Sequence, residues 1–394
     1  MNPPARSRER LITVPFVIAF VANLLQGLAL HGYLHLPGFL ADLGAAEATI
    51  GFVFGVMSGA AIFIRPFAGR VMDVWGRRPV ILAGGVAHLA ACALYLTVVD
   101  VGPWLVAVRV LQGFAEGAIF SSLFTYAADI VPASRRTEGM GLFGVSGMLP
   151  ISLGGLLGDV VLAHAGYREL FMVSVAIATV ALLASLPLTE PEKPRGAPRG
   201  EGFFAALRQR DLMPIWFVGS AFATALAAGF VFLKRFVEEE QIGSVGLFFS
   251  TYAAAAILLR VFFGWVPDRL GPKRVFFPSM LGIGFAMGMV SIAHSDLDIA
   301  IAGVLAGIGH GYAFPILSAM VVDRANPSDR GSAVSLFTAV FDAGIFAGGP
   351  VLGWVAEAAG FRTMYLSAAA LPLFGAIIFW LWDRRVEPRA ATAE

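Results

Sequence analysis

The amino-acid sequence predicts an all-α polytopic membrane protein in which twelve transmembrane helices form two pseudo-symmetric six-helix bundles. The first observation is composition, because 58% of the 394 residues are hydrophobic and only 14% are charged. Soluble domains carry about 25% charged residues. The second observation is a set of twelve apolar segments, and the third is an internal repeat at a spacing of about 195 residues.

Each apolar segment is long enough to cross a hydrocarbon core, which needs roughly 20 residues per helix. The segments are too long and too uniformly apolar for the strands of a membrane β-barrel, which alternate over roughly ten residues. Residues 11–32 follow a basic start as in a signal peptide, but their length predicts a retained first helix. The twelve expected spans are 11–32, 48–71, 79–99, 102–127, 138–161, 167–188, 211–235, 244–266, 274–293, 297–322, 331–354 and 361–382.

The basic residues predict the orientation of these spans. Most of the 28 Lys and Arg residues fall in every second connection between the segments, and loops rich in Lys and Arg stay in the cytoplasm. We therefore expect a multi-pass protein of the cell membrane, in bacteria the inner membrane, with both termini in the cytoplasm. Cys92 is the only cysteine, so the sequence offers no disulfide framework and no cysteine-based metal site.

The chain divides at one long polar stretch, residues 189–210, which is rich in Pro, Gly and Arg and reads as a cytoplasmic linker. Residues 1–188 and 211–394 are then two six-helix bundles. The motif GRVMDVWGRRPV at Gly69–Val80 reappears as GWVPDRLGPKRV at Gly264–Val275, with Gly, Asp and Gly in the same frame. A duplicated membrane bundle is typical of secondary transporters, which bind their substrate near mid-membrane between the repeats.

The first of these motifs resembles the signature loop between the second and third helices of the major facilitator superfamily. RVLQG at Arg109–Gly113 resembles the fourth-helix motif of proton-coupled members, and PASRRTEG after the fourth span resembles the loop that follows it. GMLPISLGG in segment 138–161 resembles the Gly-Pro antiporter motif in part, since Leu precedes its Pro, and GGPVLG in segment 331–354 is the better match. The chain is thus similar to the proton-coupled drug and metabolite exporters of this superfamily.

The resemblance implies that the charged loop closes the cytoplasmic side between the bundles. Asp73 is expected to contact the start of segment 331–354, where the helix dipole favours an anion, and Arg77 is expected to contact Asp129. Gly69 lies four residues before Asp73 on the same helix face and permits a close helix approach. The alternative is that the loop only anchors the topology, for which basic residues suffice.

The internal repeat extends the same expectation to the second half. Asp268 is expected to meet the start of segment 138–161, with Gly264 as its close-approach residue, and Asp323 is expected to meet the basic residues of the second loop. The expected cytoplasmic gate consists of Gly69, Asp73, Arg77, Asp129, Gly264, Asp268 and Asp323.

Four ionisable residues inside the spans are candidates for proton coupling, because such residues are costly in a membrane. Glu116 is the first candidate and Asp342 the second. Arg109 lies seven residues before Glu116 on one helix face, and His310 titrates near neutral pH without help. The alternatives are a fixed salt bridge for Glu116, a hydrogen-bonded packing role for His310, and a packing acid at Asp342.

The resemblance implies that the first, fourth, seventh and tenth spans line the substrate cavity. Arg65 and Arg260, which match in the repeat, are expected to be structural or gating residues. His31 and His35 have a spacing that can bind a transition metal, but no third ligand is evident, and an interfacial pair is the alternative. The expected cavity residues are Asn23, Gln26, Arg109, Gln112, Glu116, Thr224, Lys234 and His310.

These features predict a monomeric secondary active transporter that works by alternating access, takes protons and a small-molecule substrate in a lipid membrane, and needs no metal or cofactor. We expect proton-coupled export of a drug-like or metabolite substrate. The alternative is proton-coupled uptake of a small organic anion, held by Arg109 and Lys234. An enzyme or a nucleic-acid-binding protein is not expected, because the sequence shows no hydrolase, zinc-protease or dinucleotide motif and no large extramembrane domain.

Overall fold

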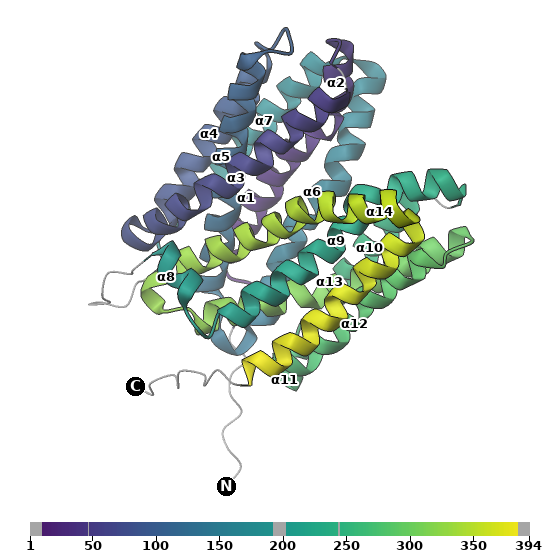
Figure 1. The fold of residues 1–394 in the computed structure, drawn as a ribbon. Coiled ribbons are helices and arrows are strands. Elements are labelled where there is room, and N and C mark those ends of the chain that lie inside the picture. The colour runs from purple at the N-terminus through teal and green to yellow at the C-terminus, as the bar shows by residue number, and fades with distance from the viewer. Residues whose placement is uncertain (1–9, 46, 192–201, 243–244, 385–394) are drawn as a thin grey trace.

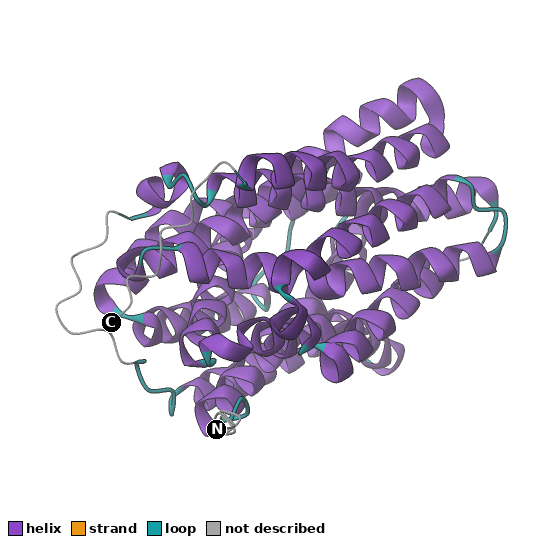
Figure 2. Cartoon of the chain, turned by 90° about the horizontal axis from the view of Figure 1, so that it is seen from below, coloured by secondary structure: helices purple, strands orange, loops and turns teal. Residues whose placement is uncertain are grey.

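The computed structural model describes residues 10–45, 47–191, 202–242 and 245–384, and every regular element in these residues is a helix (Figures 1 and 2). Eleven helices in this part of the chain are long and apolar enough to cross a membrane. The last of them, α14 (Arg330–Asp383), merges two helices, because Gly360 inside it has a φ of 81°. The described residues therefore contain the twelve spans that the sequence predicts.

The first half of the chain contributes six of these spans, which gather in one bundle (Figure 1). Their ends lie within a few residues of the predicted ranges. They are α1 (Val14–His31), α3 (Glu47–Trp75), α4 (Arg77–Tyr95), α5 (Pro103–Ile130), α6 (Arg136–His164) and α7 (Tyr167–Ser185).

The second half contributes the other six, which form the green and yellow bundle of Figure 1. They are α9 (Met213–Glu240), α10 (Val245–Phe263), α12 (Pro272–Ser291), α13 (Asp296–Arg324) and the two helices of α14. Three shorter helices connect the spans: α2 (Leu36–Asp42), α8 (Phe203–Arg208) and α11 (Val266–Leu270). Helix α8 lies within the stretch that composition marks as a polar linker.

Local sequence explains where several helices begin. The Thr13 hydroxyl accepts a hydrogen bond from the Phe16 N–H at the start of α1, and Ser295 caps α13 in the same way. Gly76 and Gly271 stand between α3 and α4 and between α11 and α12, with φ of 105° and 96°. Only glycine adopts such angles without strain, so the repeated motif sets the same sharp turn in both bundles.

Close helix contacts hold each bundle together, since lipid provides no hydrophobic driving force between helices. A Cβ on Gly113 of α5 would collide with the backbone carbonyl of Met57 on α3, and a Cβ on Gly307 of α13 would collide with that of Tyr252 on α10. The pair α5–α3 in one bundle thus packs as α13–α10 does in the other. Large side chains such as Phe285 and Phe374 are more than 60% exposed and cover the surface that would face lipid.

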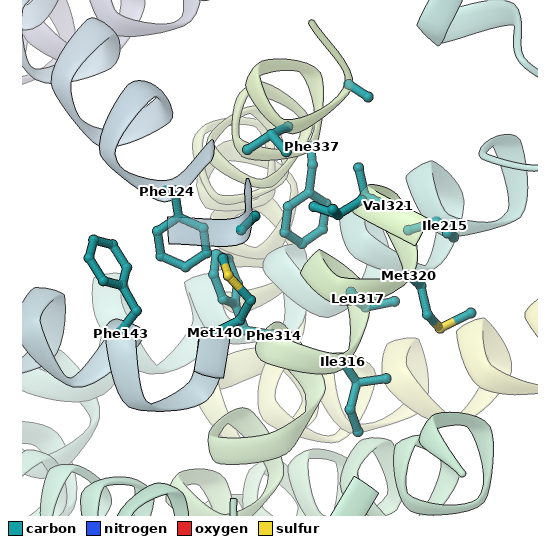
Figure 3. Packing of buried hydrophobic residues seen from close by; sticks show 14 of the residues in the cluster. Phe124, Met140, Phe143, Ile215, Phe314, Ile316, Leu317, Met320, Val321 and Phe337 are labelled. Atoms are coloured by element: carbon teal, nitrogen blue, oxygen red, sulfur yellow. The ribbon is translucent and has the colours of Figure 1, made fainter. Parts of the chain in front are cut away.

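An apolar cluster joins the two bundles in the middle of the molecule (Figure 3). Phe124 of α5 packs edge-on against Phe314 of α13, with ring centroids 5.6 Å apart. Phe143 of α6 meets Phe124 at 5.6 Å, and Phe337 of α14 meets Phe314 at 5.3 Å. Aromatic pairs of this kind contribute about 0.5–1.5 kcal/mol each beyond the area they bury. We call these four rings the aromatic floor.

Candidate functional site

A cavity of about 390 Å³ lies between the two bundles, and Phe314 of the aromatic floor is part of its wall. Most of the wall comes from α1, α3, α4, α5 and α6, and the second half contributes only residues of α13 and α14. The lining residues are Asn23, Gln26, Gly27, Leu30, His31, Met57, Ser58, Ala61, Arg65, His88, Glu116, Ile119, Phe120, Gly147, Ile151, Phe314, Thr338, Phe341 and Asp342. The wall is thus largely apolar and aromatic, with a small number of polar groups, as is usual for small-molecule sites.

Three charged side chains meet in this cavity. Arg65 Nη2 lies 2.6 Å from Asp342 Oδ2 and 3.8 Å from Glu116 Oε2. Arg65 and Glu116 belong to the first bundle and Asp342 to the second, so the shorter ion pair spans the bundle interface. We call these residues the charge triad. The sequence singled out both acids and predicted a structural or gating role for Arg65, whose side chain lines the cavity.

The arginine of the charge triad is not fully satisfied within the described residues. The Arg65 side chain is only 1% exposed, yet its Nε and Nη1 atoms have no hydrogen-bond partner there. A buried donor without a partner costs about 1–3 kcal/mol. The triad therefore has two guanidinium nitrogens with unpaired N–H groups beside two carboxylates, so a water molecule or a polar group of a substrate could bind there and change the pairing.

Two predicted cavity residues on α5 lie elsewhere. Arg109 Nη1 donates to Gln112 Oε1 at 2.7 Å, its Nε donates to the Val53 carbonyl at 3.2 Å, and its guanidinium covers the Phe54 ring at 4.7 Å. Arg109 and Glu116 do share a helix face, which is turned to α3, but they lie about 10 Å apart along the axis. Arg109 and Gln112 are thus buried inside the first bundle and do not line the cavity.

Three further candidates belong to the second bundle. His310 Nδ1 is hydrogen-bonded to the Tyr252 hydroxyl, and its ring packs against Phe222, 5.3 Å between centroids. The Thr224 hydroxyl donates to the Gly344 carbonyl at 3.2 Å. Neither residue is in the cavity lining, so the structure gives His310 the hydrogen-bonded packing position that the sequence left as its alternative. The side chain of Lys234 lies outside the described residues.

The first bundle supplies a polar wall opposite the second. Asn23 Nδ2 donates to Ser146 Oγ at 2.8 Å, and Gln26 and His88 line the cavity with Oε1 and Nε2 buried and without a partner in the described residues. His88 was not found from the sequence, because a single histidine in an apolar span carries no pattern. Gln26 Oε1 and His88 Nε2 can therefore form hydrogen bonds with a bound molecule.

His31 is the last residue of α1, and His35 ends the short 3-10 helix that follows it. His31 Nδ1 contacts the Gly27 carbonyl at 2.7 Å and His35 Nε2 contacts the Gly155 carbonyl at 3.0 Å. Among the described residues, no group of three or more His, Cys, Asp or Glu side chains is placed to hold a metal ion.

The charged loops lie where the resemblance places them. The Asp73 carboxylate accepts hydrogen bonds from the N–H groups of Gly331 and Ser332 at 2.8 and 3.0 Å and from the Ser332 hydroxyl at 2.6 Å. This caps the start of α14. A Cβ on Gly69 would lie 2.9 Å from Ser332 Cα, so the helices approach there as closely as a glycine allows.

The second bundle repeats this contact. The Asp268 carboxylate accepts from the N–H groups of Thr137 and Glu138 at 3.1 and 2.8 Å, at the start of α6. Burial raises the pKa of the Asp268 carboxyl group, and these N–H groups oppose the rise by stabilising the anion. A Cβ on Gly264 would lie 2.5 Å from the carbonyl oxygen of Arg260, which belongs to the same segment. Gly264 therefore permits the bend of the chain after α10, and it is not the close-approach residue between the bundles that the sequence predicted.

Two acids at the ends of α5 and α13 complete the set of inter-bundle contacts. Asp129 accepts from Arg77 Nε at 2.8 Å and lies 3.5 Å from Arg330 Nη1 across the interface. The sequence predicted that Asp323 meets the basic residues of the second loop, but Asp323 pairs instead with Arg136 across the interface. The second loop has Pro272 where the first loop has Arg77, so it lacks the arginine that would make the equivalent contact.

These contacts define which end of the cavity is closed. Among the described residues, the polar contacts between the bundles run from the level of the charge triad to the end that carries Asp73 and Asp268. The aromatic floor lies between the charge triad and this end. Phe124 stands between Glu116 and Asp129 on α5, and Phe337 stands between Ser332 and Asp342 on α14. The bundles splay apart toward the other end (Figure 1). The structure is thus closed at the loop end.

The sequence of the whole chain matches a family model. The model of the Major Facilitator Superfamily covers residues 16–244 and 239–394. The chain belongs to the major facilitator superfamily. It is therefore a membrane transporter, of a family whose members are carriers of small molecules and not enzymes.

Curated relatives of this superfamily protein are of similar length. The MFS-type transporter YhhS of Escherichia coli K12, described as uncharacterized, is 24% identical over 363 residues, which cover 89% of this chain and 87% of that one. YhhS of Salmonella typhimurium is 25% identical over 369 residues, with the same coverage.

Solved structures show the same fold. The human organic anion transporter MFSD10 matches with a TM-score of 0.81 at 20% identity, over 95% of this chain and 100% of that one. The fucose:proton symporter FucP of Escherichia coli matches with a TM-score of 0.78 at 15% identity, over 95% of this chain and 99% of that one. The transporter FucP in the outward conformation matches at 0.79 and 16% identity with the same coverage. A bacterial homologue of ferroportin in an outward-facing state matches at 0.77 and 14% identity, over 95% and 100%. At these identities the likeness concerns the fold alone.

Proposed function

We propose that this transporter exports small amphipathic molecules in exchange for protons, with Glu116 and Asp342 as the proton-binding groups. The observation that carries the proposal is the ion pair between Arg65 and Asp342, because it spans the two bundles inside the cavity. A proton on Asp342 removes the charge that holds Arg65. Arg65 then has Glu116, 3.8 Å away, as its remaining carboxylate partner.

This exchange links protonation to the bundle interface. With Asp342 ionised, Arg65 ties α3 to α14; with Asp342 protonated, Arg65 pairs within its own bundle and the mid-membrane tie is lost. A ligand or proton shifts a conformational equilibrium only by its differential affinity for the two states, and the charge triad provides that difference. The two bundles, taken as residues 1–188 and 211–394 joined by the linker 189–210, would rock as units.

The orientation follows from the basic loops. If the Lys- and Arg-rich loops face the cytoplasm, the closed end with Asp73 and Asp268 is cytoplasmic and the structure is outward-facing. The charge triad is then accessible to protons from outside, and the loop contacts form a cytoplasmic latch. The same orientation places both termini in the cytoplasm, with the bacterial inner membrane as the location.

The lining favours amphipathic substrates over small anions. Phe120, Phe314 and Phe341 offer flat apolar surfaces, and two carboxylates accompany a single arginine in the wall. The alternative function, uptake of an organic anion, required Arg109 to bind the substrate. The Arg109 side chain instead donates hydrogen bonds to Val53 and Gln112 inside the first bundle, so the main argument for anion uptake is lost.

The test uses everted membrane vesicles with an acidified lumen and two fluorescent probes, the amphipathic cation ethidium and the organic anion fluorescein. The expected result is accumulation of ethidium by the wild type, and none by Glu116→Gln or Asp342→Asn. Both variants keep counterflow exchange of ethidium without a pH gradient, because the cavity remains. Glu357→Gln, which changes an exposed acid, is the matched control and accumulates ethidium as the wild type does.

Two results would contradict the proposal. One is gradient-driven ethidium accumulation that persists in both variants of the charge triad, which would remove proton coupling from these acids. The other is fluorescein efflux from the acidified lumen together with protons and no movement of ethidium, which would establish anion symport instead.

A further inference from the structure

A second hollow lies far from the charge triad, at the end of the second bundle that carries the Gly271 turn. It has a volume of about 410 Å³ and is lined by Lys273, Arg274, Phe277, Phe379, Trp380, Asp383 and Arg384. These residues come from the first turns of α12 and the last turns of α14. We call this hollow the basic groove.

The basic groove has an excess of positive charge. It contains three cationic side chains and one carboxylate, Asp383, which is already paired with Lys273 and lies 2.5 Å from Arg324 Nη1. Within the described residues, no acid lies at ion-pair distance from Arg274 or Arg384. Arg384 rests on the Trp380 ring at 4.4 Å. The groove therefore has two cations available for an anion.

The first bundle shows what fills the equivalent position there. The Glu190 carboxylate accepts hydrogen bonds from the N–H groups of Arg77 and Arg78 at 2.7 and 2.9 Å, and a Cβ on Gly76 would collide with it. The position 194 residues after Glu190 is Arg384. A Cβ on Gly271 would meet nothing within 4 Å, so the second bundle has an open space and a cation where the first has a carboxylate.

We propose that the basic groove binds the phosphate headgroup of an anionic phospholipid, which supplies the negative charge that Glu190 supplies in the first bundle. The surroundings match a lipid more closely than a soluble anion. The groove lies at the ends of two membrane-spanning helices, and Trp380 beside it is 45% exposed. Exposed Trp at a helix end marks the membrane interface. The partly exposed ring of Phe277 offers an apolar surface for an acyl chain.

The proposal is independent of the transport chemistry in the cavity. It uses the orientation given above only to name the leaflet, since the cytoplasmic leaflet carries the anionic lipids in which basic pockets between helices bind headgroups. Failure of the proton-coupling test would leave the basic groove unchanged, and loss of lipid binding would leave the charge triad unchanged.

The experiment is native mass spectrometry of the purified full-length protein titrated with phosphatidylglycerol, phosphatidylcholine or inorganic phosphate. We expect the wild type to retain phosphatidylglycerol at least ten-fold more strongly than phosphatidylcholine. In the variant Arg274→Gln/Arg384→Gln this preference falls by about ten-fold or more, because each cation near the membrane surface strengthens binding of an anionic lipid several-fold. The variant keeps the pair of Lys273 with Asp383, and so keeps the contact that stabilises the fold.

The matched control removes two basic residues from the same end of the molecule. Arg208→Gln/Arg210→Gln changes two exposed arginines that are not in the groove and keeps the wild-type preference. A preference lost equally in both double variants would overturn the proposal, since it would show a general charge effect. Equal retention of both lipids by the wild type would also overturn it, as would binding of inorganic phosphate that displaces phosphatidylglycerol at equal concentration.

Discussion

Each bundle has a buried arginine at an equivalent position, Arg65 on α3 and Arg260 on α10. The partner of the first is a carboxylate, and the partners of the second are neutral groups. Arg65 contacts Asp342 across the bundle interface at 2.6 Å. Arg260 donates instead to the Gly311 carbonyl and to the Met148 sulfur, both at 3.0 Å. Met148 lies 194 positions before Asp342. One interface therefore pairs its arginine with an acid, and the other pairs it with a thioether.

This difference separates the charge-dependent contact from the neutral one. The loop contacts are alike in both bundles, since Asp73 and Asp268 each accept N–H groups at the start of a helix in the partner bundle. Among the described residues, only the α3–α14 interface has an ionisable pair at mid-membrane. At the matching position of the α6–α10 interface, Arg260 contacts the sulfur of Met148. A proton can therefore alter one interface and leave the other in place, which permits rocking about the neutral interface.

The largest expected effect comes from comparing Arg65→Met with Arg260→Met. Arg65→Met leaves the partly exposed carboxylates of Glu116 and Asp342 without their cation. This removes the contact that responds to protonation, and we expect gradient-driven transport to fall to background. Arg260→Met replaces a buried cation that has no acid partner by an apolar chain of similar size, so transport persists. Vesicle transport and protein yield of both variants check this. Equal loss in the two variants would show that the bundles do not differ in this way.

The second prediction places an acid at the neutral interface. Met148→Asp brings a carboxylate next to Arg260, and a hydrogen bond between charged groups contributes about 1.5–3 kcal/mol. We expect the thermal midpoint of the purified protein to rise and counterflow exchange to slow about ten-fold or more, because the α6–α10 interface becomes tied. Met148→Leu is the control and changes neither. An unchanged rate of exchange in Met148→Asp would contradict this expectation, because it would show that an ion pair between α6 and α10 does not resist the rocking motion.

The third prediction concerns the loop contact of the α3–α14 interface. Gly69→Ala places a methyl group 2.9 Å from Ser332 Cα and 3.1 Å from Ser335 Cβ, and such overpacking costs about 1–3 kcal/mol. We expect a longer distance between spin labels attached at Trp75 and Leu270, which are both exposed near the loops.

Gly349→Ala is the control for this measurement, because a Cβ there would meet nothing within 4 Å. An unchanged distance distribution in Gly69→Ala would show that the glycine contact does not limit closure.

The smallest expected effect lies at the opposite end, where the second bundle alone has an ion pair within the described part of the chain. Arg362 Nη2 lies 2.7 Å from Glu240 Oε2, and the hydrogen bond from Arg362 lowers the pKa of Glu240 below its ordinary value. The pair therefore stabilises the folded state above the ordinary pKa, and this contribution is lost as the pH falls through the lowered pKa. Because partly exposed pairs contribute about 0–1 kcal/mol, Glu240→Gln should melt slightly below the wild type at pH 7.

The difference in melting temperature between Glu240→Gln and the wild type should shrink as the pH falls through the lowered pKa of Glu240, because the wild-type side chain then loses its charge as well. A difference that stays the same over this range of pH would assign the effect to shape instead of charge.

Local patterns predicted the spans, because helix length and glycine turns depend on short stretches of sequence. The contact of Asp73 with the start of α14 was predicted by the resemblance that its motif carries. The pair of Arg65 and Asp342 depends on how two bundles face each other, which no local pattern contains. A signal did exist, since the repeat aligns Asp342 with Met148 and Arg65 with Arg260. An acid in only one copy indicates a site where the two halves differ.

The position of Arg109 could not be predicted for a different reason. Helical spacing correctly places it on the face of Glu116, but periodicity gives direction around an axis and not depth along it. Phe54 and Tyr95 enclose Arg109 at its own level, while the cavity opens only at the level of Glu116. No periodic pattern in the sequence predicts His88 as a cavity residue or the basic groove. Both depend on how the helices pack.

The aromatic floor has an electrical consequence. When water fills the cavity between the bundles, most of the membrane voltage drops across the layer below it from which water is excluded. That layer contains the aromatic floor of Phe124, Phe143, Phe314 and Phe337. A unit charge that crosses a full drop of 100 mV gains or loses about 2.3 kcal/mol. A charged substrate or cation that crosses at this depth would therefore move through most of the membrane field. Its movement would be measured as a gating current.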